Sequence, residues 1–216
     1  RLGESLVDNL AELHGVPTDL EALQKLGRPD GFVERQIERW LSVRQEHGVR
    51  DLPELFALGE WLGRNVPPSS APAVIHGDYH LDNTLASKDH PEILAIIDWE
   101  LATVGDCYLD VALMLMFWGD YRTQDPPAFS ALQAVSRRTG VLSRRELAGR
   151  WAEKLGRPLH HMNFYMAFAF WRLAAIIEGA YGLHVAGKLD SDYARGLEHD
   201  VPALLAEAQS AAAGDW

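Results

Sequence analysis

Two short apolar runs in the middle of the sequence most constrain what this chain can fold into. They span 73–75 and 93–97, consist of Ala, Val, Ile and Leu, and are each followed closely by acidic residues. Short apolar runs of this kind favour buried strands when turn residues bound them. The polar segment Ser87–Pro91 between the runs has turn chemistry. The sequence therefore predicts one short β-hairpin.

Three oxygen-bearing side chains lie just past or between the ends of these predicted strands: Asp78, Asn83 and Asp98. At such positions the backbone is anchored while the side chains remain free. Carboxylate and amide oxygens suit a hard divalent cation such as Mg²⁺, which takes few protein oxygens and adds phosphate oxygens. The pattern therefore indicates a site that handles magnesium and phosphate together.

The spacing of these residues resembles a kinase active site. His76-Gly77-Asp78 is followed five residues later by Asn83, and Asp98-Trp99-Glu100 stands further along the chain. In protein kinases a His-Arg-Asp triplet is followed at the same distance by Asn, and a later Asp-Phe-Gly supplies a second metal ligand. The variants in this chain resemble the aminoglycoside phosphotransferase and choline kinase branch, which phosphorylates small molecules.

Within that branch, one subgroup is the most similar. The segment 96–106 (Ile-Ile-Asp-Trp-Glu-Leu-Ala-Thr-Val-Gly-Asp) resembles the kinase-like domain fused to acyl-CoA dehydrogenases in some eukaryotes, and so do Gly27–Phe32 and the pair Arg35-Gln36. The resemblance implies an ATP-dependent phosphotransferase that acts on a hydroxyl group of a small molecule. A hydroxyacyl thioester, a hydroxy acid or an aminoglycoside is the acceptor that it suggests.

The resemblance also implies roles for five residues. Asp78 is the catalytic base, which orients the acceptor hydroxyl and takes its proton. Asn83 and Asp98 are the Mg²⁺ ligands, and the metal contacts the β- and γ-phosphates of ATP. His76 and Asp110 are structural, because in the family they brace the catalytic loop by hydrogen bonds.

Five further residues are candidates for contact with the substrate: His80, Asp82, Glu100, Arg172 and Glu178. Each has an ordinary alternative. His80 is left open, and Asp82 is otherwise a loop residue. Glu100 either touches a second metal or the substrate, or is a solvated carboxylate. Arg172 and Glu178 are charged residues inside an apolar helix, and they either face the acceptor or form an exposed stripe or an internal ion pair.

The rest of the chain reads as helix. Apolar residues at helical spacing or capping signals predict helices over 2–13, 32–46, 51–63, 110–118, 128–138, 144–155, 160–186 and 192–213. Capping-box spacing occurs at Thr18–Glu21 and at Ser143–Glu146. The predicted fold class is α+β but mostly α. It matches the C-terminal lobe of a protein-kinase-like, aminoglycoside phosphotransferase-like fold, with the one hairpin carrying the catalytic residues.

Composition and charge exclude several classes of partner. The formal net charge of −11 argues against a nucleic-acid surface, which needs a basic patch. The most apolar region, Phe164–Ile177, is interrupted by Arg172 and is shorter than the ~20 residues that span a bilayer. We expect no membrane partner and a cytoplasmic location. Cys107 is the only cysteine, so no intramolecular disulfide is expected.

A complete member of the family would also have a β-rich N-terminal lobe, with a loop over the nucleotide phosphates and a lysine that contacts them. Only Lys25 and Lys88 precede Asp98, and neither has the Val-Ala-Ile-Lys context of that lysine. We therefore expect residues 1–216 to form the C-terminal lobe of a longer protein. The isolated lobe is expected to be inactive.

Two other functions are compatible with the residues. His76, Asp78, His80 and Asp82 alternate, and imidazole with carboxylate suits Zn²⁺, so a metal-dependent hydrolase is one alternative. The other is a non-catalytic kinase-like binding module that keeps the pocket. A hydrolase does not explain why Asn83 and Asp98 follow Asp78 at kinase spacing. A binding module without catalysis does not need to keep all three residues.

Overall fold

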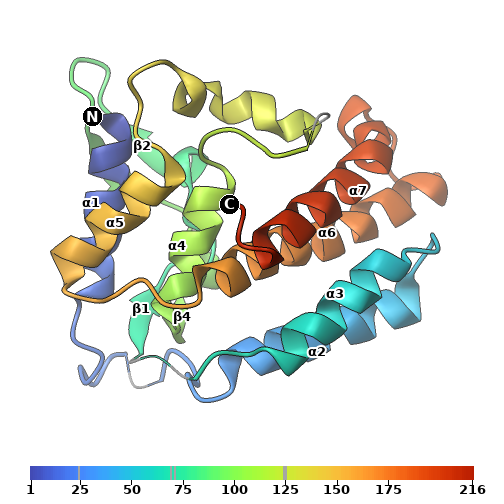
Figure 1. Ribbon diagram of the computed structural model, residues 1–216, viewed down its shortest axis with the longest axis horizontal. Coiled ribbons are helices and arrows are strands. Elements are labelled where there is room, and N and C mark those ends of the chain that lie inside the picture. Colours follow the sequence, from blue (N-terminus) through green and yellow to red (C-terminus); the bar gives the residue numbers. More distant parts are fainter. Residues whose placement is uncertain (24, 69, 71, 124–125) are drawn as a thin grey trace. The chain divides into compact units, whose positions relative to one another are not determined.

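The computed structural model describes the chain except residues 24, 69, 71, 124 and 125, and the side chains of 129–132. The described residues form seven α-helices, three 3₁₀ helices (η) and four short strands (Figure 1). The elements are α1 (Leu2–His14), α2 (Phe32–His47), α3 (Pro53–Arg64), β1 (Ala73–Ile75), η1 (Leu81–Asn83), β2 (Thr84–Ala86), β3 (Ile93–Ile96), η2 (Trp99–Leu101), β4 (Thr103–Gly105), α4 (Cys107–Met116), η3 (Ala128–Arg137), α5 (Arg144–Leu155), α6 (Met162–Val185) and α7 (Asp192–Ala212). The mostly α fold class is confirmed.

The chain divides into two compact units. Unit 1 comprises Arg1–Phe32, Pro68–Asp120 and Gln133–Met162, and so contains α1, the strands, α4 and α5. Unit 2 comprises Val33–Pro67, Tyr121–Leu132 and Asn163–Trp216, and contains nearly all of α2 together with α3, α6 and α7. The residues of the predicted hairpin all belong to unit 1.

The strands form two small sheets, whereas the sequence predicted one hairpin. β2 and β3 make an antiparallel hairpin, in which Thr84 lies opposite Ile96 and a β-bulge follows Leu85. β1 instead pairs with β4, and Val74 lies opposite Val104. The expected pairing of 73–75 with 93–97 is therefore wrong. β2 and β4 have three residues each, too few to show a periodic pattern, so the true strand partners could not be predicted from sequence.

Helix α4 forms the centre of unit 1. It begins at Cys107 because the side chain of Asp106 accepts a hydrogen bond from the backbone N–H of Tyr108, 3.1 Å away. All ten residues of the helix are buried. A helix that is apolar almost all round is expected in a core position. The helix predicted over 110–118 is confirmed, and it starts three residues earlier than expected.

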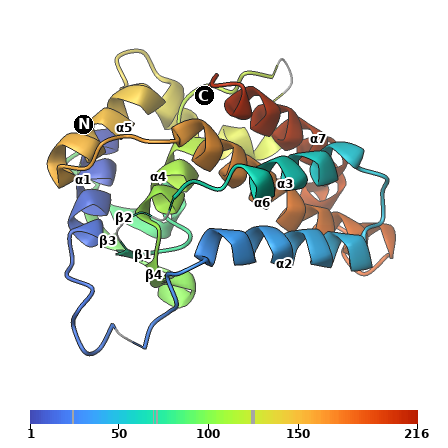
Figure 2. The same cartoon turned by 60° about the horizontal axis from the view of Figure 1, so that its bottom comes forward.

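Helices α1 and α5 pack side by side in unit 1 (Figures 1 and 2). The capping box predicted at Ser143 is confirmed at the start of α5, since its side chain accepts from the backbone of Glu146 and the Glu146 carboxylate accepts from Ser143. The one predicted at Thr18 is wrong, because the chain there forms turns. A helix that began after Thr18 would soon meet Gly27 and Pro29, which both disfavour a helix interior.

An ion pair fastens α1 to α5. Arg150 donates two hydrogen bonds to the Asp8 carboxylate, of 2.6 and 2.7 Å, and Lys154 lies 3.1 Å from it. Partial burial alone would raise the pKa of Asp8, but the hydrogen bonds and charges of Arg150 and Lys154 outweigh it and hold this pKa below its usual value.

We expect this ion pair to make stability depend on acid pH. A carboxyl group with a lowered folded-state pKa stabilises the protein above its unfolded pKa of about 4, and the contribution disappears as the pH falls through the folded value. The free energy of unfolding of the wild type should therefore exceed that of Asp8→Asn at pH 6, and the gap should close toward about pH 2. Urea titrations at several pH values measure it. Asp89→Asn, in an exposed turn, is the control that should show no such closing gap.

Unit 2 is organised around α6. Its aromatic residues between Phe164 and Trp171 are buried, and Trp171 donates from Nε1 to the carbonyl oxygen of Leu55 at 2.7 Å, which ties α6 to α3. By length and composition alone, α6 is sufficient to cross a membrane, so the expectation that this region is too short is wrong. Of the most apolar 18-residue stretch of α6, 56% is buried within the structure. Core helices of soluble proteins can have the same length and apolar composition.

Arg50 joins three segments of unit 2. It makes an ion pair with both carboxylate oxygens of Glu178 on α6, and its Nη1 donates to the carbonyl oxygen of Glu198 on α7 at 2.9 Å. That carbonyl has no helical partner because the residue four positions on, Pro202, lacks an N–H. Arg50 therefore satisfies the backbone oxygen that the proline leaves open.

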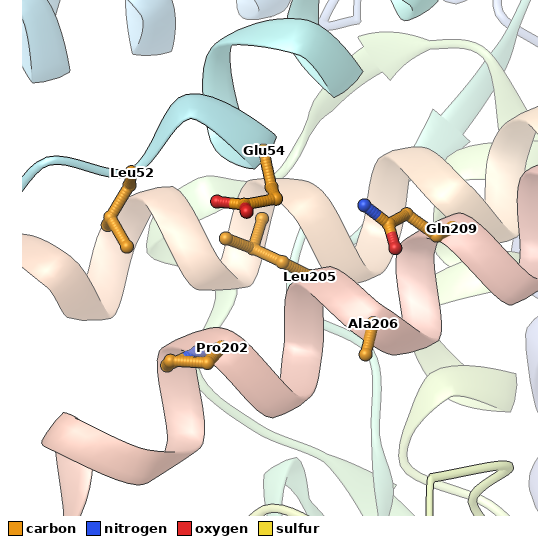
Figure 3. Close-up of a pocket in the computed structure, with 6 residues that line it drawn as sticks. All are labelled: Leu52, Glu54, Pro202, Leu205, Ala206 and Gln209. Carbon is orange, nitrogen blue, oxygen red and sulfur yellow. The ribbon is translucent and has the colours of Figure 1, made fainter.

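Helix α3 packs against α7 in the same unit, and a cavity of about 250 Å³ lies between the start of α3 and α7 (Figure 3). It is lined by Leu52, Glu54, Pro202, Leu205, Ala206 and Gln209. The candidate residues from the sequence lie elsewhere.

Candidate functional site

A buried carboxylate holds the backbone of the loop that follows β1 by hydrogen bonds. Asp110, on α4, accepts a hydrogen bond from the backbone N–H of His76 at 2.6 Å and from that of Gly77 at 2.8 Å. Asp110 is 1% exposed. Hydrogen bonds to an ionised carboxylate are among the strongest in proteins, so this contact fixes the backbone immediately before Asp78. It is the bracing geometry that the resemblance implied for Asp110.

Gly77 is required by the shape of this loop. Its φ is +83°, and a Cβ added there would lie 2.5 Å from the carbonyl oxygen of Leu101. An L-residue in this region costs about 1–2 kcal/mol before any clash. Only glycine therefore lets the loop pass so close to η2.

We expect Gly77→Ala to disturb the site more than the same change at Gly140. Gly140 has φ +82° but no atom within 4 Å of an added Cβ, so Gly140→Ala carries the conformational cost without the clash. Thermal unfolding of both variants, with turnover of the complete protein, measures the difference. Equal losses in the two variants would contradict the claim that contact with Leu101 matters.

His76 links the loop that carries Asp78 to the loop that carries Asp98. It is fully buried, its Nε2 lies 2.8 Å from the carbonyl oxygen of Ile97, and its Nδ1 lies 3.3 Å from the backbone N–H of Asp78. Because Nδ1 accepts from an N–H, the neutral ring carries its proton on Nε2 and donates it to Ile97. One side chain thus bonds to the backbone of Asp78 and to the residue before Asp98.

Asn83 orients Asp78. Its Nδ2 donates to the backbone carbonyl of Asp78 at 2.8 Å and to the carboxylate Oδ2 at 3.0 Å. The amide nitrogen is therefore committed to Asp78, and Oδ1 is the end of the Asn83 side chain that can bind a cation. The Asp78 side chain is 40% exposed, so solvent and a ligand can reach it.

Asp98 is held in a rare backbone conformation beside Asn83. The backbone N–H of Ile97 donates to the carbonyl oxygen of Asn83 at 3.0 Å, which places Asp98 and Asn83 at the same end of the β2–β3 hairpin. Asp98 has φ 66° and ψ 57°, is exposed, and precedes η2. Non-glycine residues in this region cost of order 1–3 kcal/mol and cluster at functional sites.

The oxygen atoms of Asn83 and Asp98 fit Mg²⁺ as ligands. The set is one carboxylate and one amide oxygen on rigid hairpin ends, with the Asp78 carboxylate adjacent, and Mg²⁺ is typically bound by one or two carboxylates plus substrate phosphates. A catalytic zinc ion needs three protein ligands. Within the described part of the chain, no group of three or more His, Cys, Asp or Glu side chains is placed to hold a metal ion, which removes the support for the zinc hydrolase.

His80 lies within a polar cluster next to Asp78. Its Nε2 is 3.8 Å from Asp78 Oδ1, its Nδ1 is 3.6 Å from Asp82 Oδ2, and its ring packs against Phe117 at an interplanar angle of 35°, with centroids 4.6 Å apart. The side chain of Gln133 completes the cluster by donating to Asp82 Oδ2 at 3.1 Å. His80 and Asp82 are therefore brought to the proposed catalytic residue, as a substrate contact requires.

Gln133 was missed by sequence reasoning. The segment 128–138 was predicted as a surface helix, but it forms the 3₁₀ element η3, in which Gln133 is 2% exposed and has non-helical φ and ψ of −108° and 36°. The kink turns this one side chain toward the loop. A single glutamine in a polar segment carries no signal of its own for such a contact.

The remaining candidates lie on other elements. Glu100 is exposed on η2, so a role toward metal or substrate stays a prediction. Arg172 and Glu178 lie on α6 in unit 2. Glu178 is 1% exposed and both its oxygens bond to Arg50, which is the internal ion pair that the sequence left open as its alternative. Arg172 is half-buried, and its proposed role stays a prediction.

Comparison with known proteins identifies a matching family and several relatives. A family model described as "Phosphotransferase enzyme family" matches residues 1–156. Acyl-CoA dehydrogenase family member 10 of Mus musculus is 29% identical over 187 residues, covering 84% of this chain and 17% of the relative. Family member 11 of Rattus norvegicus is 31% identical over 191 residues, covering 87% and 24%. The chain thus spans a quarter or less of the length of these curated relatives.

Solved structures show the same fold. A protein of Ralstonia eutropha JMP134, provisionally assigned as an aminoglycoside phosphotransferase, has a TM-score of 0.84 and 26% identity, covering 97% of this chain and 64% of that one. A spectinomycin phosphotransferase solved with ADP and spectinomycin has a TM-score of 0.61 at 12% identity, with the same coverage. The second likeness shows the fold alone. The resemblances inferred from 76–83 and 96–106 are confirmed.

Proposed function

Because the chain belongs to the phosphotransferase enzyme family, we propose that it forms the catalytic part of an enzyme that transfers the γ-phosphoryl group of ATP to a hydroxyl of a small molecule. One observation carries the proposal. Asp78, Asn83 and Asp98 are gathered by a pair of loops whose backbones are fixed by the buried side chains of His76 and Asp110. Preorganised charge is the main resource of enzymes that move a phosphoryl group.

In this reaction Asp78 orients the acceptor hydroxyl and accepts its proton as the new oxygen–phosphorus bond forms. The bond between the γ-phosphorus and the bridging oxygen breaks, and ADP leaves. Asn83 Oδ1 and the Asp98 carboxylate would hold Mg²⁺, which when bound neutralises charge on the β- and γ-phosphates. Asn83 has a second task, because its amide nitrogen keeps the Asp78 carboxylate oriented.

For the acceptor, we propose a hydroxyacyl thioester or hydroxy acid ahead of an aminoglycoside. The relatives by sequence are acyl-CoA dehydrogenase family members, whereas the likeness to antibiotic phosphotransferases below 25% identity extends only to the fold. His80, Asp82, Glu100 and Arg172 remain the proposed acceptor contacts. Among them, His80 and Asp82 have the best support, since they adjoin Asp78.

We also propose that a β-rich lobe outside residues 1–216 covers the nucleotide and supplies the phosphate-binding loop and lysine. Support comes from large apolar side chains that are exposed around the site: Leu85, Leu94, Ile97, Trp99 and Leu101. Exposed apolar side chains concentrated in one segment typically meet a partner or ligand. The intact mass of the natural polypeptide tests this, because the lobe requires a mass clearly above the 24.1 kDa of this chain.

The experiment for the proposed function is a screen for ADP release. The complete protein is mixed with Mg²⁺-ATP and separate sets of hydroxyacyl thioesters, hydroxy acids and aminoglycosides, and ADP formed only in the presence of an acceptor supports the proposal. Removing the metal with EDTA should abolish the reaction, and Mg²⁺ should restore it, because the bound metal neutralises charge on the β- and γ-phosphates. If no acceptor stimulates ADP release and a titration shows no binding of Mg²⁺-ATP, the non-catalytic binding module becomes the better account.

A further inference from the structure

A buried row of polar side chains runs from α5 through α1 to Asp110. Trp151 on α5 donates from Nε1 to Nδ1 of His14 at 3.0 Å, and Nε2 of His14 lies 3.3 Å from Oδ2 of Asp110. The exposed fractions of Trp151, His14 and Asp110 are 0%, 2% and 1%. His14 is the last residue of α1, and its ring also meets the Trp151 indole edge-on.

The direction of these hydrogen bonds follows from the chemistry of the groups. An indole N–H can only donate, so Nδ1 of His14 must accept. The neutral imidazole therefore carries its proton on Nε2, and this N–H points to Asp110. As a result Asp110 receives three donors: Nε2–H of His14 and the backbone N–H groups of His76 and Gly77.

The row is hydrogen-bonded at every step, although the helix–helix contact around it is otherwise apolar. The neighbouring buried positions on α1 are Leu6, Val7, Leu10 and Ala11. A buried polar group is costly unless it is hydrogen-bonded, and a complete network selects one arrangement. Oδ2 of Asp110 accepts from both Nε2–H of His14 and the backbone N–H of His76, so His14 limits rotation of the carboxylate that holds the loop.

We propose that His14 and Trp151 are positioning residues for the catalytic loop. They fix the orientation of the Asp110 carboxylate, which fixes the backbone of His76 and Gly77 and therefore the place of Asp78. This inference rests on the proposed function and deepens it, since neither residue touches substrate or nucleotide. The competing view is that both merely fill the core between α1, α4 and α5.

The two views differ in what a matched pair of substitutions does. His14→Gln retains a donor and an acceptor on one planar amide, whereas His14→Leu retains only the volume. Trp151→Phe keeps an aromatic ring but removes the N–H, and it provides a second test if His14→Leu does not fold. Leu147→Ala, a fully buried residue of α5, is the control for lost packing alone.

Hydrogen exchange of the His76 and Gly77 amides, followed by NMR in the 216-residue chain, is the first measurement. After correction for the global change seen in α6 amides, these two should exchange about tenfold faster in His14→Leu and Trp151→Phe, and near the wild-type rate in His14→Gln and Leu147→Ala. The proposal is overturned if the two amides respond no more than those of α6, or if His14→Gln behaves like His14→Leu.

Turnover in the complete protein is the second measurement. The same two damaging variants should lower kcat by about tenfold with little change in the KM for ATP, and His14→Gln should recover kcat. Because hydrogen exchange requires no substrate, it tests the row even if the proposed reaction is wrong. Conversely, unaltered exchange would overturn this inference and leave the proposed function standing.

Discussion

Asp78→Asn in the complete protein is expected to lower kcat by about 10²–10⁴-fold, the usual worth of a general base. The amide has nearly the same shape as the carboxylate, and its oxygen can still accept the hydrogen bond from Asn83 Nδ2 that Asp78 Oδ2 accepts now at 3.0 Å. Folding and the loop conformation should therefore persist. What is lost is a group able to take the proton of the acceptor hydroxyl.

The measurement is ADP release at saturating acceptor, together with binding of Mg²⁺-ATP by titration calorimetry. Binding should change little, because Asn83 and Asp98 rather than Asp78 are the proposed metal ligands. Asp89→Asn is the matched control, as it makes the same chemical change in the exposed turn of the β2–β3 hairpin. If Asp78→Asn turns over at the rate of this control, Asp78 is not the base and the assignment of the catalytic loop fails.

The parts of the site that were predictable from sequence are local in the chain. Asp78 and Asn83 are five residues apart on one loop, so their spacing alone places them together, and the Asn83 amide does bond to Asp78. Asp98 was also identifiable, because it ends an apolar run and the kinase pattern expects it there. Their positions are confirmed as a shared location, while their roles stay predictions.

The parts that were not predictable depend on contacts between distant segments. Gln133 reaches Asp82 across 51 residues through a kink in η3, and Glu178 meets Arg50 across 128. No periodicity or composition encodes such a pairing. The prediction of the strand partners failed for a related reason. The three-residue segment β4 is a strand because it pairs with β1, and its own sequence does not indicate one.

Arg50→Met is expected to be strongly destabilising, although Arg50 lies outside the site. The side chain of Glu178 is 2% exposed and that of Arg50 20%, so the pair is shielded from water. Removing one partner of a buried ion pair typically costs about 3–5 kcal/mol, because the other charge is left uncompensated. The change also removes the donor to the Glu198 carbonyl that Pro202 leaves open.

We expect that Arg44 will not replace the lost partner. Burial lowers the pKa of Arg44, and the charge of Glu178 opposes that effect, so the two groups sense each other. Within the described residues, however, Nε and Nη1 of Arg44 have no hydrogen-bond partner, and the hydrogen bonds of Glu178 come from Arg50. A repacking that brings Arg44 onto Glu178 would reduce the loss below the range expected for an unpaired charge.

Urea unfolding followed by circular dichroism measures the loss, and Arg195→Met is the control. Arg195 pairs with Asp190 and Asp192 at the surface, where its side chain is 52% exposed, and such pairs contribute about 0–1 kcal/mol. The double variant Arg50→Met with Glu178→Leu should regain much of the stability, since it removes both charges and keeps the volume. If Arg50→Met costs no more than Arg195→Met, the ion pair does not stabilise unit 2, and Glu178 is again available as a candidate for the acceptor site.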